Sequence, residues 1–191
     1  MELTEMTVAG GLPLAKRIAK TARRGLTLIE AAMVLAILAL VIAGIMLFYT
    51  QANSSRLTTA ALNDLAAVQQ TVRSLYGGQS VYTGVTSAIV AQTQTLPAKM
   101  TSGNTLRHSF NGTITIAAAD AGGGTGSGFS VAFANVPKEA CVKMLSSDLG
   151  RGLYSAGASV IQNQNTGLPF NPTQATASCN QANNTITWVF N

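Results

Sequence analysis

Charged side chains are scarce in this chain. Of its 191 residues only 10% are Asp, Glu, Lys or Arg, whereas 47% are hydrophobic. Such scarcity is typical of a protein that is packed against copies of itself. The formal net charge is +5, but the residues after position 25 hold only seven basic and five acidic side chains. That excess is too small and too scattered to indicate a nucleic-acid-binding surface.

Histidine and cysteine are also rare, and carboxylates do not come in pairs. The single histidine, His108, argues against a Ser-His-Asp triad, and its polar surroundings beside Arg107 predict a surface position. Two cysteines and one histidine fall short of the four ligands of a structural zinc site. Neither a calcium loop nor an acid–base pair is expected, because the carboxylates beyond residue 60 stand alone. They are Asp64, Asp120, Glu139 and Asp148. The sequence therefore predicts no enzyme, no cofactor and no metal site.

One long apolar run dominates what is present. It extends over 23 residues from Leu26 to Phe48 and contains a single charge, Glu30. At about 1.5 Å per residue a helix of this length spans about 35 Å, enough for the roughly 30 Å hydrocarbon core of a bilayer. Five basic residues precede the run, and the first charge after it is Arg56. This asymmetry predicts a cytoplasmic N-terminus and a C-terminal bulk outside the membrane.

Two residues distinguish this run from an ordinary membrane anchor. Glu30 places a carboxylate at membrane depth, where its cost predicts a functional role; a position among the headgroups is the alternative. Gly25 lies directly before the run. Signal peptidase cuts after an apolar region, near a small-x-small site, and no good site of that kind follows Phe48. A cut at Gly25 would instead remove a hydrophilic leader and leave the whole apolar helix on the mature protein.

The segment Arg24-Gly25-Leu26-Thr27-Leu28-Ile29-Glu30 resembles the class III signal of type IV prepilins. The resemblance implies that a prepilin peptidase cuts after Gly25 and methylates the new amine of Leu26. Glu30 is then the fifth mature residue. The leader of 25 residues and the leucine at the first mature position resemble the type IVb subclass. That subclass includes the toxin-coregulated, bundle-forming and longus pili and the thin pili of conjugative plasmids.

The resemblance implies the type IV pilin fold, of class α+β. A long N-terminal helix, with an apolar and an amphipathic half, packs on a C-terminal antiparallel sheet domain with one disulfide. The expected parts are a leader (1–25), a transmembrane and filament-core helix (26–49), an amphipathic half (50–76) and a globular head (77–191). Apolar residues at helical spacing support the amphipathic half. They are Leu57, Ala61, Leu65, Val68, Val72 and Leu75.

The expected helix therefore runs from Leu26 to Tyr76 and stops at Gly77-Gly78. Gly44 is its weakest point, since glycine costs about 1 kcal/mol relative to alanine in a helix. The resemblance implies that the helix breaks there in a filament. In the head we expect a short helix near 85–93 and a helix that begins with Asn135 as its cap and runs to Leu149. Strands are expected at 113–117, 129–134 and 184–190, the last inside the sheet. A glycine-rich linker at 120–128, without a phosphate-binding ending, and mostly loop at 151–176, with a short strand at 158–162, complete the expectation.

Cys141 and Cys179 both lie in the part expected outside the membrane. In an oxidising compartment two such cysteines predict a disulfide, and the chain-entropy model gives it about 4 kcal/mol. By resemblance the pair bounds the region of pilins that faces outward and varies between strains.

The leading hypothesis is the major structural subunit of a type IVb pilus, which supports adhesion, aggregation or conjugative mating contact. The freed amine of Leu26 is expected to pair with Glu30 of a neighbouring copy. The precursor is expected in the inner membrane with its head in the periplasm, and the pilus outside the cell. Expected partners are further copies in a helical homopolymer, prepilin peptidase, the inner-membrane assembly platform, inner-membrane lipid, and a host or recipient cell surface. The alternatives are a minor pilin or secretion-system pseudopilin, and a membrane-anchored binding domain that never polymerises.

Overall fold

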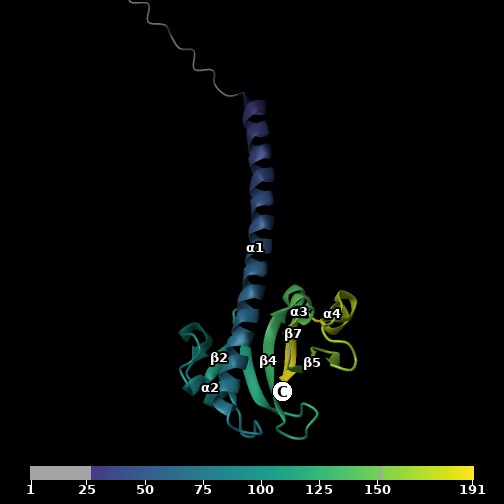
Figure 1. Ribbon diagram of the computed structural model, residues 1–191. Coiled ribbons are helices and arrows are strands. Elements are labelled where there is room, and N and C mark those ends of the chain that lie inside the picture. The colour runs from purple at the N-terminus through teal and green to yellow at the C-terminus, as the bar shows by residue number, and fades with distance from the viewer. Residues whose placement is uncertain (1–26, 151) are drawn as a thin grey trace, which may run out of the picture. The chain divides into compact units, whose positions relative to one another are not determined.

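The computed structural model describes residues 27–150 and 152–191 (Figure 1). Contacts divide the chain into two compact units, Met1–Gly44 and Ile45–Asn191. The longest element, helix α1 (Leu28–Tyr76), has residues in both units. Its 49 residues include no proline, and it ends at Tyr76, directly before Gly77-Gly78 as the sequence predicts. The expected α+β class is confirmed, with one long helix and one antiparallel sheet.

The second half of α1 buries one stripe against the sheet. Four of the six predicted stripe residues are no more than 1% exposed, and they are Ala61, Leu65, Val68 and Val72. Leu75, at the end of the predicted stripe, remains 39% exposed. Three polar residues, Thr58, Asp64 and Thr71, are buried beside the apolar ones. The helical period thus predicts the buried face but not the polar groups within it.

Seven strands form one sheet in the order β1-β2-β3-β4-β7-β5-β6, and all neighbours are antiparallel. Their bounds are β1 Thr101–Ser102, β2 Thr105–Arg107, β3 Thr113–Ala119, β4 Gly128–Pro137, β5 Leu153–Gly157, β6 Ile161–Asn163 and β7 Asn183–Phe190. The predicted strands correspond to β3, β4 and β7. β7 lies inside the sheet, between β4 and β5, as its aromatic and β-branched sequence predicts.

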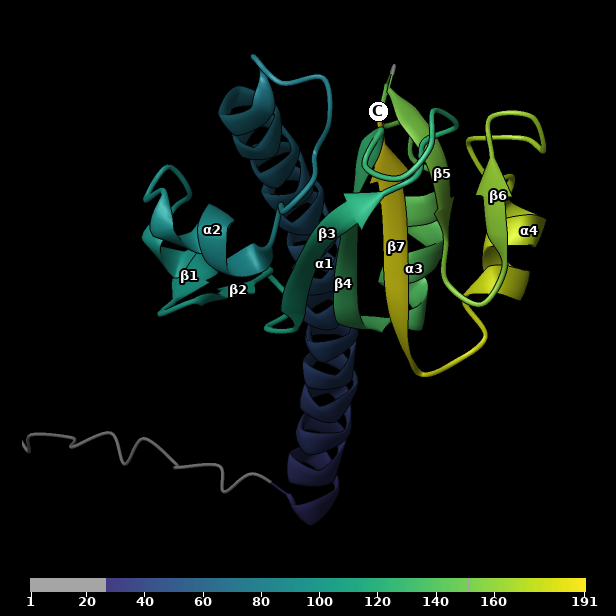
Figure 2. The ribbon, with the colours of Figure 1, turned by 90° about the horizontal axis from the view of Figure 1, so that it is seen from below.

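One face of the sheet holds the core. From Phe129 to Phe133 in β4 and from Ile186 to Phe190 in β7 every second residue is fully buried, and Val131 pairs with Trp188 and Phe129 with Phe190 across the strands. Figure 2 shows α1 and α3 (Lys138–Leu145) on the same side of the sheet. The remaining helices lie towards its edges: α2 (Ser87–Gln92) and the 3-10 turn η1 (Ala98–Met100) near β2, and α4 (Pro172–Ser178) near β6.

The expected helix from Asn135 to Leu149 is wrong at both ends. Asn135 does not cap a helix; it has a positive φ of 62° and lies at a bulge in β4, where the register with β7 shifts between Phe133 and Val136. The strand continues to Pro137, and α3 begins at Lys138 and ends at Leu145. Asparagine tolerates the left-handed conformation that such a bulge requires, as well as the cap position.

The segment 151–176, expected to be mostly loop, contains β5, β6 and most of α4. The strand predicted at 158–162 is wrong in position, because β5 ends at Gly157 and β6 begins at Ile161. Gly157 lies too close to the backbone of Val160 and Ile161 to accommodate a Cβ, so the turn between these strands requires a glycine there. α4 begins with a capping box formed by Asn171 and Gln174.

Candidate functional site

The apolar half of α1 is exposed along its whole length. Every residue from 27 to 50 is exposed except the half-buried Ala31. Within the described residues α1 is the one helix long and apolar enough to cross a membrane, and its apolar part is not buried. This surface therefore requires a cover outside the chain, from lipid or from other proteins.

The residues expected to act in processing and assembly lie at or before the start of α1. Gly25 and Leu26 fall outside the described residues. Glu30 lies in the first turn of α1, exposed, and its N–H donates to Thr27 Oγ1 at 3.3 Å. Gly44 is helical, and a Cβ built there meets nothing within 4 Å. The packing of a single copy therefore does not require a glycine at position 44.

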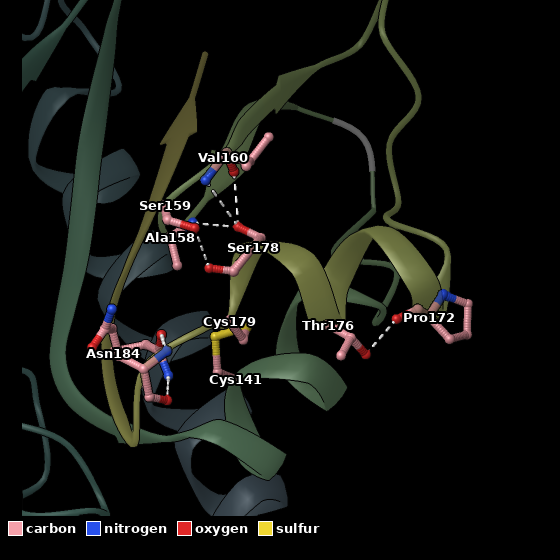
Figure 3. Close-up of a disulfide and its surroundings, with 10 residues drawn as sticks. Cys141, Ala158, Ser159, Val160, Pro172, Thr176, Ser178, Cys179 and Asn184 are labelled. Atoms are coloured by element: carbon pink, nitrogen blue, oxygen red, sulfur yellow. Dashed lines mark hydrogen bonds between the residues drawn. A yellow bond between two sulfur atoms is a disulfide. The ribbon is translucent and has the colours of Figure 1, made fainter.

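The expected disulfide between Cys141 and Cys179 is present. Cys141 lies in α3 and Cys179 is the C-cap of α4; their Cα atoms are 6.0 Å apart, and the two residues are 38 positions apart in sequence. Both cysteines are fully buried. The bond joins α3, whose preceding strand β4 is central, to the segment that returns into β7 (Figure 3).

Ser178, next to the disulfide, fixes the end of α4 to the turn between β5 and β6. Its buried Oγ accepts from the N–H of Ala158 at 3.0 Å and of Val160 at 3.3 Å, and donates to the Val160 carbonyl at 2.9 Å. Its carbonyl accepts from the N–H and hydroxyl of Ser159. Figure 3 shows bonds from Ala158, Ser159 and Val160 converging on Ser178. The disulfide and Ser178 together fix α4 to α3 and to the β5–β6 edge of the sheet.

A second polar cluster joins α1 to the segment that carries η1, β1 and β2, at the other edge of the sheet. The carboxylate of Asp64, 3% exposed, accepts from both the N–H and the hydroxyl of Ser109. Its other oxygen lies 3.1 Å from Lys99 Nζ. A buried carboxylate is stable only when its hydrogen-bonding capacity is used, and here a charge and two donors use it. The cluster therefore pins the loop before β3 onto the helix.

The predicted surface position of His108 is wrong, since this side chain is only 4% exposed. Its ring stacks on Phe133, and Nε2 lies 2.8 Å from the carbonyl oxygen of Ala134. Burial lowers the pKa of His108, and the Ala134 carbonyl and the nearby Asp64 carboxylate oppose that shift. The bulge in β4 turns the Ala134 carbonyl towards the ring, and a Cβ at Gly112 would collide with both.

Sequence reasoning missed Asp64, His108 and Ser109 as a group. The turn before β3 closes with Asn111 N–H donating to the His108 carbonyl at 2.7 Å. Asp64 directly precedes Leu65, a residue of the predicted apolar stripe. This proximity is the sequence signal that could have indicated that Asp64 is buried. Residues 27–150 and 152–191 contain no group of three or more His, Cys, Asp or Glu side chains that could hold a metal ion.

Two solved structures share this fold. A crystal structure of a type IVb pilin from Salmonella typhi superposes with a TM-score of 0.52 and 23% identity, over 69% of this chain and 96% of that one. A crystal structure of TcpA, a type IV pilin from Vibrio cholerae El Tor biotype, superposes with a TM-score of 0.50 and 11% identity, over 71% of this chain and 99% of that one. At these identities the likeness establishes the fold.

Sequence comparison decides the family. The model of the PilS N-terminal family matches residues 55–191, well over half of the chain. The chain is 30% identical over 154 residues to the major structural subunit of bundle-forming pilus from Escherichia coli O111:H-, covering 80% of this chain and 79% of that protein. The same subunit from Escherichia coli O127:H6 (strain E2348/69 / EPEC) is 30% identical over 149 residues, with coverages of 77% and 76%. The chain belongs to the type IVb pilins.

In this type IVb pilin the family match covers the amphipathic half of α1 from residue 55 onwards and the entire head. It includes the disulfide, the Ser178 bonds and the cluster around Asp64. The apolar half of α1 precedes the matched region and carries Glu30, one of the two predicted assembly residues. Type IVb pilins are structural proteins. Their function depends on how copies join and on what keeps each head folded.

Proposed function

We propose that this chain is the major structural subunit of a type IVb pilus. The observation that carries the proposal is the exposed apolar half of α1. Fifteen large hydrophobic side chains between Leu28 and Tyr49 are each at least 48% exposed. Lipid covers them before assembly, and the helices of neighbouring copies cover them in the filament core. The bundle-forming pilus subunits to which the chain is similar are named major subunits, which favours this role over that of a minor pilin.

Prepilin peptidase prepares the subunit by cutting after Gly25 and methylating the amine of Leu26. α1 begins at Leu28, so the cut removes the leader and leaves the helix whole. Cleavage frees a cationic amine four residues before Glu30. In the filament this amine pairs with Glu30 of a neighbour. Because each charge is costly to bury alone, the pair stabilises only when both partners are present and thereby sets the register between copies.

Gly44 supplies the flexibility that helix packing in the filament requires. Its backbone is helical in the single copy, and open space surrounds the position of a missing Cβ. Glycine at this position therefore serves contacts or bending outside the single copy. We propose that α1 loses its helical hydrogen bonds first around Gly44 when the subunit enters the filament.

Before assembly the subunit lies in the inner membrane, with the N-terminus in the cytoplasm and the head in the periplasm. The basic residues before the apolar run support this orientation, and the disulfide fits the oxidising periplasm. The inner-membrane assembly platform then extracts the subunit into the growing pilus. The extracellular pilus contacts host or recipient cells, in adhesion, aggregation or mating.

Electron microscopy of sheared surface filaments, with N-terminal sequencing of their main subunit, tests the proposal. The expected result is filaments built mainly of this chain, beginning at a methylated Leu26. Filaments that contain the chain only in traces would assign it to the minor pilins. An uncut chain that stays in the membrane of cells without filaments would assign it to membrane-anchored binding domains.

A further inference from the structure

A cavity of about 410 Å³ opens between α1 and the loop that carries η1 and β2. Three cations line it: Arg56 from α1, Lys99 from η1 and Arg107 from β2. The buried carboxylate of Asp64 lies at its wall and is held by Lys99 and Ser109. The cavity, its three cations and the end of the apolar run from Ile45 to Tyr49 all belong to the same compact unit.

The charges of this cavity do not balance. Asp64 neutralises Lys99 at 3.1 Å, and the lowered pKa of buried His108 keeps that ring neutral at pH 7. Arg56 and Arg107 remain, both exposed. One Nη of Arg107 donates to the Asn111 carbonyl at 3.1 Å, which orients its guanidinium and leaves further donors free for a ligand. Two arginines facing one cavity match the oxygens of a phosphate group, which each can bind bidentately.

The position of Arg56 along α1 indicates where such a phosphate comes from. Arg56 follows Tyr49, the last residue of the exposed apolar stretch, by seven residues, which is about 10 Å of helix. Helical side chains lean towards the N-terminus, so the guanidinium reaches back towards Tyr49. The headgroup layer on each side of the hydrocarbon core is roughly 5 to 8 Å thick. With Tyr49 at the edge of the hydrocarbon, the guanidinium lies at the level of lipid phosphates.

A second hollow lies along α1 between Arg56 and Tyr49, at the end of the apolar stretch. Its volume is about 280 Å³, and Tyr49, Ala52, Asn53 and Arg56 line it. Arg56 thus borders both hollows. A molecule that fits this arrangement has a phosphate at one end and an apolar part that continues past Tyr49. A free phosphate fills the first hollow only.

We propose that the cavity lined by Arg56, Lys99 and Arg107 binds the phosphate of an anionic phospholipid from the membrane that holds the unassembled subunit. The lipid's glycerol and upper acyl chains follow the hollow beside Tyr49 and Asn53. Binding holds the head of the precursor on the membrane surface until the subunit is extracted. This inference rests on the proposed function, which places the precursor in a membrane.

The test uses the full chain, purified in detergent and reconstituted into vesicles of phosphatidylcholine, alone or mixed with phosphatidylglycerol. Lipids that remain bound on gentle re-extraction are counted by native mass spectrometry. The wild-type chain is expected to retain phosphatidylglycerol in preference to phosphatidylcholine. Arg56→Gln and Arg107→Gln are each expected to reduce that retention about fivefold, and the double variant about 25-fold.

Lys138→Gln is the matched control. It removes one exposed cation from the first turn of α3, outside the cavity, and its expected retention equals that of the wild type. An unchanged retention in the double variant overturns the inference, and so does an equal loss in Lys138→Gln, which would mean attraction by net charge alone. Inorganic phosphate, added at the lipid phosphate concentration, is expected not to displace the lipid. Full displacement would make this a free-phosphate site.

The same experiment separates failure of the inference from failure of the proposed function. Flotation of the wild-type chain with phosphatidylcholine vesicles reports membrane insertion without any anionic lipid. A chain that does not float contradicts the membrane-bound precursor. A chain that floats but retains no phosphatidylglycerol contradicts only the lipid site. If the double variant keeps the lipid and instead fails to form filaments, the cations serve contacts between copies and the lipid site is wrong.

Discussion

The ring of His108 stacks on the ring of Phe133, with centroids 4.6 Å apart and an angle of 3° between the planes. Both ring nitrogens have partners. With the proton on Nε2, that nitrogen donates to the Ala134 carbonyl, and Nδ1 accepts the N–H of Phe110 at 3.3 Å. A second proton on Nδ1 would face the Phe110 N–H and end that hydrogen bond. The neutral imidazole is therefore the form that the folded head accommodates.

The head should lose stability as the pH falls below about 6.5, the ordinary pKa of histidine. Burial lowers the pKa of His108 in the folded chain. The unfolded chain therefore binds the proton at a higher pH than the folded chain does, and unfolding becomes more favourable as the pH falls from the unfolded pKa through the folded one. Urea-unfolding midpoints of the purified chain, measured at several pH values between 7 and 5, test this expectation.

His108→Gln is the control for that measurement. His108 is the only histidine of the chain, so the pH dependence in this range should flatten in the variant, although its stability at pH 7 is lower. An equal slope in both proteins would assign the effect to the carboxylates instead.

The sequence predicts those helices and strands whose hydrophobic residues recur at helical or strand spacing and are buried on one face. The helical spacing from Ala61 to Val72 and the strand pattern of β7 belong to this class. Asn135 misled the prediction because one residue type suits both a helix cap and a bulge with positive φ. Only the pairing of β4 with β7 decides between the two, and local sequence does not contain that pairing.

For a similar reason, the polar cluster around Asp64 could not be predicted from the local sequence. Asp64 and Ser109 are 45 residues apart, and His108 and Ala134 are 26 apart. In the sequence, Asp64, His108 and Ser109 each look like surface residues. They become buried partners because the loop before β3 folds back onto α1, and the pattern of neither segment encodes the other. By contrast, Cys141 and Cys179 could be paired from sequence, since two cysteines allow one intramolecular bond.

Ser178→Ala should destabilise the head by about 1–3 kcal/mol. The substitution leaves the N–H groups of Ala158 and Val160 and the Val160 carbonyl without the partner that the buried hydroxyl provides. Thr176→Ala, two residues earlier in the same helix, removes an exposed hydroxyl that bonds only within α4, and should change stability by no more than about 0.5 kcal/mol. Urea unfolding of both variants tests the difference. Equal effects would mean that α4 is not anchored through Ser178.

The disulfide should contribute about 4 kcal/mol to the stability of the head. Replacing Cys141 and Cys179 together by alanine removes the bond without leaving a free thiol, and should lower the unfolding free energy by about that amount. Dithiothreitol should lower the unfolding midpoint of the wild type towards that of the double variant and leave the variant unchanged. Unreduced peptide mapping of protein from filaments should show the linked pair. Free thiols in that material would contradict the role of the bond in the assembled pilus.

Gly25→Val should leave the leader uncut. Prepilin peptidase must approach the backbone at the membrane boundary, and a branched side chain there obstructs it. The expected product is a membrane protein 25 residues longer than the mature subunit, detected by mass. Gly44→Ala serves as the control, because its added methyl group meets open space and lies far from the cut in sequence. Mature-sized protein from Gly25→Val would mean that the cut is elsewhere.

Glu30→Ala should abolish pili while leaving the subunit itself intact. Glu30 lies five residues after the predicted cut, and its exposed side chain has no role in the folding of the head. The variant should therefore be cut after Gly25, form its disulfide and accumulate in the inner membrane. N-terminal sequencing, unreduced peptide mapping and cell fractionation check these three expectations, and electron microscopy counts the pili.

The expected loss of pili follows from the energy of an unpaired charge. In the proposed contact, loss of the Glu30 carboxylate would leave the amine of a neighbour's Leu26 buried alone, at a cost of about 3–5 kcal/mol for each contact. The cost recurs with every subunit added, so growth fails even though each subunit folds. Glu30→Gln keeps the shape of the side chain and removes its charge, and should fail as Glu30→Ala does. Wild-type subunits mixed with Glu30→Ala should rescue short filaments, because only some contacts are then defective. Normal piliation by either variant alone would place the Glu30 carboxylate among the lipid headgroups rather than in a contact between copies.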